Sequence, residues 1–315
     1  PLWKVAHSVE AYAGSHGLGR AALDTTGPIS DNLAYRLNVA VEDKGSFRDQ
    51  VSAQRQVVAP AFTWKLSPDT VLEYTSEYLR HATPLDRGVV AVNNQLGALP
   101  VSRFLGEPAD GDVTVTNQTH QLVLSHEWNA DWRSRTGLSY RETGLKGFST
   151  EASALQADGR TLRRQRRYRD FQSDDVALQA ELQGTVRAGG LEQEVLVGVE
   201  SYRFHMDSLM LRANPSASAP YAIDIFNPVY GQAQPTPGRN TDTREKQRNT
   251  ALYVQDTVKL GEQWRVMAGL RADNYDQSLQ NRLNATTTTQ TPSAVSPRLG
   301  VSWLPSAGWT VYANA

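Results

Sequence analysis

Cysteine is absent from this chain of 315 residues. Its absence excludes a disulfide framework and thiolate metal sites, and it fits either a reducing cytosol or a cysteine-poor envelope protein. An excess of one charge is absent too, since 32 basic residues face 33 acidic ones. The overall charge therefore gives no indication of nucleic acid or of an acidic substrate.

Long apolar runs are also missing. No stretch approaches the roughly 18 to 20 apolar residues that a transmembrane helix needs. That test does not detect membrane β-strands, which need only about ten residues of alternating character. The chain begins at Pro1 without a signal peptide, and we expect it to be a fragment or a processed product.

Alternation of apolar and polar residues is abundant. The stretch 252–275 holds two such runs, separated by 261–263. Because the side chains of a strand point to opposite faces with period two, Leu270 is expected on an apolar face and Arg271 on a charged one. Similar runs occupy 35–41, 72–78, 176–183 and 194–200. The charged face does not suit an ordinary packed core.

The connections between these runs alternate in length. Short ones lie near 30–32, 67–69, 129–131, 188–190, 261–263 and 305–308, and long polar ones span 81–116, 144–172, 207–247 and 278–293. A soluble sandwich has no reason to alternate in this way. The pattern is typical of a strand meander in a membrane, with tight turns on one side and long loops on the other.

Tryptophan supports the same interpretation. Six of the seven tryptophans lie within a few residues of a short connection: Trp64, Trp128, Trp132, Trp264, Trp303 and Trp309. Indole rings at one common height form an interfacial girdle, and we predict that role for these six residues. The alternative is that they end strands of a soluble all-β domain, which would need no detergent.

The predicted fold is all-β, a transmembrane antiparallel β-barrel of the outer membrane. Its apolar face meets lipid, its polar face meets a wet or plugged lumen, and closure leaves no unpaired edge in hydrocarbon. We count about thirteen strands, and since bacterial barrels normally have an even number, we expect the chain to be part of a larger barrel.

Several segments of the sequence resemble one family in their order and spacing. They are GLGRAALDTTGPISDNLAYRLNVA, APAFTWKLSPDT, PLDRG followed by LPVSRFLGEP, IDIFNPVYG, YVQDTVKLGEQWRVMAGLRAD and SPRLGVSWLP. Together they resemble the TonB-dependent siderophore receptors of the Gram-negative outer membrane. The ferric-hydroxamate branch, which contains the ferrichrome receptors, is the most similar.

The resemblance implies a barrel of about 22 strands filled by an N-terminal plug. Residues 1–315 then form a partial barrel domain that lacks the plug and the last strands. The implied function is uptake of ferric siderophores with energy from the TonB–ExbB–ExbD complex, contacted through the missing N-terminal part. We expect a monomer among outer-membrane lipid and lipopolysaccharide. Iron arrives already chelated, so no cofactor is expected.

The resemblance also points to ligand-binding residues in the third to fifth loops. The aromatic cluster that the hydroxamate branch has in its third loop is not matched, because PLDRGVVAVNN offers an arginine and no ring. The candidates are Arg87, Arg103, Phe148, Tyr221, Phe226 and Tyr230. Arginine forks suit carboxylate or hydroxamate oxygens. The alternative is that the arginines are solvated or paired locally and that the rings pack the loops.

A run of five arginines lies at the base of the fourth loop: Arg163, Arg164, Arg166, Arg167 and Arg169. It either binds lipopolysaccharide phosphates or is a solvated entry to a strand.

Motifs for catalysis are missing. The histidines show no metal-ligand spacing, and there is no nucleophile elbow, P-loop or nucleotide fingerprint. We therefore predict no enzyme, no catalytic residue, no metal site in the protein and no nucleic-acid partner. A passive outer-membrane porin and an outer-membrane barrel enzyme stay open as alternative functions.

Overall fold

The computed structural model describes residues 1–218 and 220–315. In this part of the chain, fifteen strands form one antiparallel sheet, and there are two short 3₁₀ turns. The elements are β1 (Ala6–Gly14), η1 (Ser15–Gly17), β2 (Leu18–Ser30), β3 (Leu33–Gly45), β4 (Ser52–Ser67), β5 (Thr70–Thr83), η2 (Pro108–Asp110), β6 (Val113–Glu127), β7 (Trp132–Leu155), β8 (Thr161–Ala188), β9 (Leu191–Ala213), β10 (Ala222–Asp224), β11 (Gly238–Leu260), β12 (Trp264–Asn281), β13 (Thr286–Gln290), β14 (Ser293–Trp303) and β15 (Val311–Asn314).

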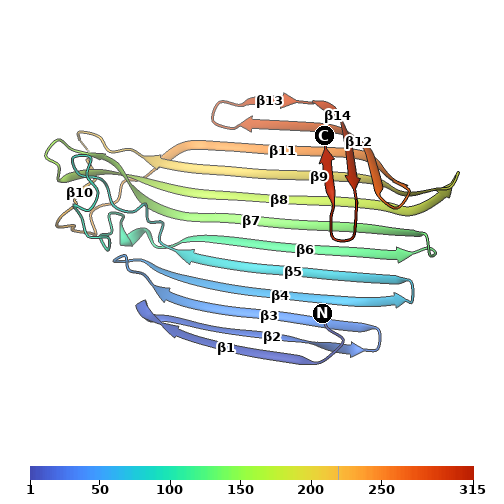
Figure 1. Ribbon diagram of the computed structural model, residues 1–315. Helices are drawn as coiled ribbons and strands as arrows, with labels where there is room; N and C mark the ends of the chain where they lie inside the picture. The colour runs from blue at the N-terminus through green and yellow to red at the C-terminus, as the bar shows by residue number, and fades with distance from the viewer. Residues whose placement is uncertain (219) are drawn as a thin grey trace.

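Thirteen of these strands follow one another across the sheet in chain order, while β10 pairs with β8 and β13 pairs with β12. Figure 1 shows the long strands side by side in a single curved sheet. The predicted all-β meander of about thirteen strands is confirmed. Over the described ranges, no helix is long and apolar enough to cross a membrane.

Connections of different length lie at opposite ends of the sheet. Tight turns span 31–32, 68–69, 128–131, 189–190, 261–263 and 304–310. The segments 84–112 and 220–237, the second of which contains β10, gather at the other end, on the left of Figure 1. The long connections 81–116 and 207–247 are therefore found at one end, as the alternating lengths predicted. The predicted long connection 278–293 is mostly strand, because β12 continues to Asn281 and β13 spans Thr286–Gln290.

The two faces of the sheet differ as predicted. Leu270 lies opposite Val254 in the register of β11 and β12, and these side chains are 48% and 46% exposed. Arg271, on the other face, binds Glu200 at 3.3 Å and Asp273 at 2.9 Å. One face is therefore apolar without a protein cover, and the other carries paired charges.

Residues 144–172 differ from the prediction, because most of them are strand and not loop. β7 and β8 continue as a paired hairpin as far as Leu155 and Thr161. Polar side chains lie on both faces of this extension, beside buried apolar ones such as Leu162, because the extension lies beyond the apolar band. The alternation that marks a membrane strand is therefore missing here, although the backbone pairing is the same.

The packed core lies at the loop end of the sheet. Its buried members are Val92, Leu99, Leu105, Leu162, Ile223 and Ile225. They come from the segment 84–112, from the β7–β8 hairpin and from β10 with its following residue. Three segments far apart in sequence thus form one folded unit, which we call the external loop unit (residues 84–112, 144–172 and 222–237).

Candidate ligand-binding site at the external loops

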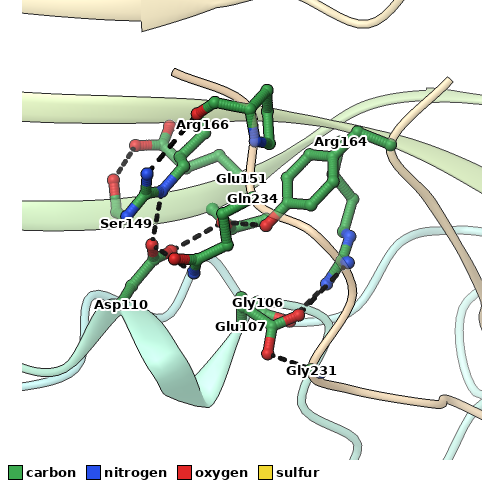
Figure 2. A network of polar contacts seen from close by, with 12 residues as sticks. Gly106, Glu107, Asp110, Ser149, Glu151, Arg164, Arg166, Gly231 and Gln234 are labelled. Atoms are coloured by element: carbon green, nitrogen blue, oxygen red, sulfur yellow. Dashed lines mark hydrogen bonds and ion pairs between the residues drawn. The ribbon is translucent and has the colours of Figure 1, made fainter. Parts of the chain in front are cut away.

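Two arginines of β8 fasten the external loop unit. Arg164 is fully buried, donates to the carbonyl of Gly106 at 2.6 Å and pairs with Glu107 at 3.4 Å. Glu107 also accepts from the backbone N–H of Gly231 at 3.0 Å, so it joins all three segments (Figure 2). A buried charge is stable only when it is paired and hydrogen-bonded.

Arg166 forms the second ion pair that holds the external loop unit together. Its Nε donates to Asp110 at 2.8 Å, and Asp110 also accepts from Thr150 at 2.6 Å and Gln234 at 3.0 Å. Figure 2 shows this carboxylate facing Arg166 and Gln234. The loops are therefore held in one arrangement by charge pairs and by an apolar core.

A different group of arginines surrounds Glu151 on the lumen-facing side of the hairpin. Arg169 binds Glu151 at 2.6 Å, Arg87 at 3.3 Å and Arg167 at 3.5 Å. Burial disfavours the Glu151 carboxylate, but hydrogen bonds from Arg169 and Ser149 outweigh it and lower the pKa of Glu151. Glu151 is thus an ionised acceptor in a strongly basic environment.

Arg212 of β9 completes this group, because it lies directly opposite Arg167 in the register of β8 and β9. We call Arg87, Arg167, Arg169 and Arg212 the four-arginine cluster. Burial lowers the pKa of Arg167, and although Glu151 opposes this, the positive charges of Arg212, Arg169 and Arg87 lower it further.

The predicted candidates occupy different surroundings. Arg87 belongs to the four-arginine cluster, and its side chain is 55% exposed. Arg103 has a buried Nε without a hydrogen-bond partner in the described part of the chain, and its carbonyl accepts from Arg48 at 3.0 Å. Phe148 packs against Tyr168, with 4.7 Å between ring centroids. The guanidinium of Arg166 lies over the Phe148 ring, 4.2 Å from its centroid.

The aromatic candidates of the fifth loop contribute mainly to packing. Tyr221 is buried and shares a hydrogen bond of 3.0 Å with Thr150. Tyr230 donates to the carbonyl of Phe104 at 2.8 Å. Burial raises the pKa of both tyrosines. Phe226 alone is open, at 37% exposure. Their predicted role in ligand binding stays a prediction.

Most arginines of the β8 run form ion pairs within the external loop unit. Arg164, Arg166, Arg167 and Arg169 all contact carboxylates. Sequence reasoning noticed this run but missed its partners and missed Arg212. Arg212 is separated from the run by a whole strand, so only the register of the sheet reveals it.

The six tryptophans that were predicted to form an interfacial girdle lie at the tight-turn end of the sheet, and their role at a membrane interface stays a prediction. Trp132 and Trp264 begin β7 and β12, Trp303 ends β14, and Trp264 stacks on Trp303 at 5.8 Å. The other three lie at the same end. Trp64 is near the end of β4, and Trp128 and Trp309 lie in the turns 128–131 and 304–310. Trp3, which sequence reasoning left out, packs against Lys65 of β4 at the same end.

Metal and catalytic groups were predicted to be missing. Within residues 1–218 and 220–315, no group of three or more histidine or acidic side chains is arranged to hold a metal ion.

Comparison with known proteins identifies the family. The model of the "TonB dependent receptor-like, beta-barrel" family matches residues 62–315. The chain belongs to this family. It is an outer-membrane β-barrel polypeptide, as the apolar face and the long strands indicate. Proteins of this family and fold are receptors and transporters for metal or siderophore uptake.

Two curated relatives of this TonB-dependent receptor chain are receptors for different metal chelates. The metal-pseudopaline receptor CntO of Pseudomonas aeruginosa (strain UCBPP-PA14) is 42% identical over 98% of this chain and 44% of its own length. The ferrioxamine B receptor of Salmonella typhimurium (strain SL1344) is 25% identical over 99% of this chain and 44% of its own length. The chain spans less than half the length of these relatives.

Solved structures show the same fold. The ferric-catecholate import receptor Fiu from E. coli K12 in its open form superposes with a TM-score of 0.86 at 19% identity, covering 100% of this chain and 54% of that chain.

Proposed function

We propose that this TonB-dependent receptor chain is the partial barrel domain of a longer protein that takes up a metal chelate with energy from TonB, ExbB and ExbD. The observation that carries the proposal is the similarity to the metal-pseudopaline receptor, at 42% identity along nearly the whole chain. The ferrioxamine B receptor is 25% identical over a similar span. The predicted restriction to ferric hydroxamates is therefore widened to metal chelates generally.

The external loop unit supports capture from outside the cell. It is a packed body, fastened by Arg164 with Glu107 and by Arg166 with Asp110. A surface of this kind is preorganised, so binding a chelate costs little ordering of the loops. The four-arginine cluster lies on the lumen-facing side of the same body, where a captured ligand would enter the barrel.

Uptake of labelled chelates tests the proposal. Cells that express the full-length gene product receive metal–pseudopaline, ferric citrate or ferrioxamine B, and cells without the gene are the control. We expect at least one chelate to accumulate only in cells that carry the gene. If none does so under metal limitation, or if small neutral sugars enter equally fast as through an open pore, the proposal is wrong.

A further inference from the structure

The four-arginine cluster places like charges directly opposite each other. Arg167 and Arg212 are register partners on neighbouring strands, and Arg169 is two residues from Arg167 on the same face. Like charges at such positions destabilise a sheet. This face also carries Gln179 and Glu181 further along β8 and therefore looks into the lumen.

One carboxylate, that of Glu151, cannot balance the positive charge of the four arginines. Glu151 already accepts from Arg169 at 2.6 Å and from Ser149 at 2.9 Å, and it pairs with Arg87 and Arg167. Among the described residues, the guanidinium of Arg212 has no ion pair, and its buried Nε has no hydrogen-bond partner. Three guanidinium groups share the carboxylate of Glu151 and the fourth, that of Arg212, has none in the described part of the chain, so the cluster carries an excess of three positive charges.

Three other arginines near the loop end, Arg164, Arg166 and Arg244, are each balanced by a carboxylate. Arg164 and Arg166 each have their own carboxylate. Arg244, on the lipid-facing side of β11, forms a two-point pair with Asp207 at 3.0 and 2.9 Å. These three arginines are paired, whereas the four-arginine cluster at the lumen-facing mouth keeps an excess of positive charge.

We propose that the four-arginine cluster is an anion subsite that binds a carboxylate group of the incoming chelate. Arg212 is its principal donor, and Arg167, whose Nε and Nη2 donate to Gln165 in the ligand-free protein, adds positive charge beside it. This inference rests on the proposed function and adds the ligand class, an anionic metal chelate that carries carboxylates. Planar guanidinium forks match a carboxylate with two parallel hydrogen bonds. The carboxylate of the ligand balances positive charge that no carboxylate among the described residues balances.

Binding measurements on the purified full-length protein in detergent test the inference. The variants are Arg167→Gln and Arg212→Gln, and the matched control is Arg244→Gln. The probes are ferric citrate, a polycarboxylate chelate, metal–pseudopaline, and ferrioxamine B, a hydroxamate chelate without carboxylate. We expect ferric citrate or metal–pseudopaline to bind, with a Kd raised by about ten- to hundredfold in both variants and unchanged in the control.

A second readout separates a binding role from a structural one. Because Arg212 has no ion pair to lose and repels Arg167, Arg212→Gln should leave the melting temperature of the ligand-free protein unchanged or raise it. Weaker binding together with undiminished stability supports the subsite.

Three results would contradict it. Unchanged affinity for a carboxylate chelate in both variants refutes the subsite while the proposed function stands. The same conclusion follows if ferrioxamine B alone binds and is unaffected. If no chelate binds or enters cells, the proposed function fails and the inference fails with it.

Discussion

Leu270→Arg is the substitution that most directly perturbs the lipid-facing surface. Leu270 lies six residues beyond Trp264, the first residue of β12. At about 3.4 Å per residue and a strand tilt of about 45°, it lies about 14 Å above the indole level. The apolar band of such barrels is about 25 Å tall, so Leu270 is close to the membrane midplane. Arginine at that depth costs about 2 to 4 kcal/mol.

The neighbouring residue provides the opposite case. Arg271→Leu removes contacts to Glu200 and Asp273, but all three side chains are 24 to 33% exposed on the lumen side. Screened pairs of this kind contribute about 1 kcal/mol or less. Replacing Arg271 should therefore disturb the barrel less than replacing Leu270.

Guanidinium unfolding of the full-length protein folded into lipid vesicles measures both effects. Leu270→Ala is the control, since it removes apolar area without adding charge. The reasoning is refuted if Leu270→Arg and Arg271→Leu lower the unfolding free energy equally, or if Arg271→Leu is the more harmful.

Three further predictions concern the loop end and the lumen wall. Glu107→Gln leaves the buried guanidinium of Arg164 without its counter-charge, and we expect a loss of about 3 to 5 kcal/mol in the loop unit, seen as faster proteolysis there; an unchanged cleavage rate would contradict this. Hydrogen bonds from Thr161 and from the backbone of Arg160 lower the pKa of Asp158 from 3.8 to about 2. The hairpin tip should therefore keep the stability that the ionised Asp158 contributes above about pH 4 and lose it as the pH falls towards 2. Amide protection factors at the tip that do not change over this range would refute the prediction. Gly198→Ala places a Cβ against the ring of Tyr253, so we expect about 1 to 3 kcal/mol of destabilisation from overpacking by the same unfolding assay, and none if that ring moves freely.

The alternation of apolar and polar residues was enough to predict the strands that lie between lipid and lumen. Leu270 and Arg271 show why, because two different solvents impose two different residue types on neighbouring positions. The hairpin extension at 144–172 has no such contrast. Its strands were therefore interpreted as a loop, although Phe148 and Tyr168 are register partners.

The candidate site depended on contacts between distant parts of the chain. The partner of Arg164 is Glu107, from another loop, and nothing in the local sequence links them. Arg212 meets Arg167 only because β8 and β9 pair in one particular register. A run of arginines in the sequence does not show which of them have carboxylate partners, because the register of the sheet determines which arginines are paired.

Energy-coupled uptake is the central claim, and the initial rate of chelate uptake in matched strains with and without TonB tests it most directly. The strains express the full-length gene product at equal levels and receive the labelled chelate that it binds. We predict that uptake stops when TonB is deleted or the proton-motive force is collapsed, while binding at the cell surface persists. An uptake rate that is unchanged without TonB would contradict the account.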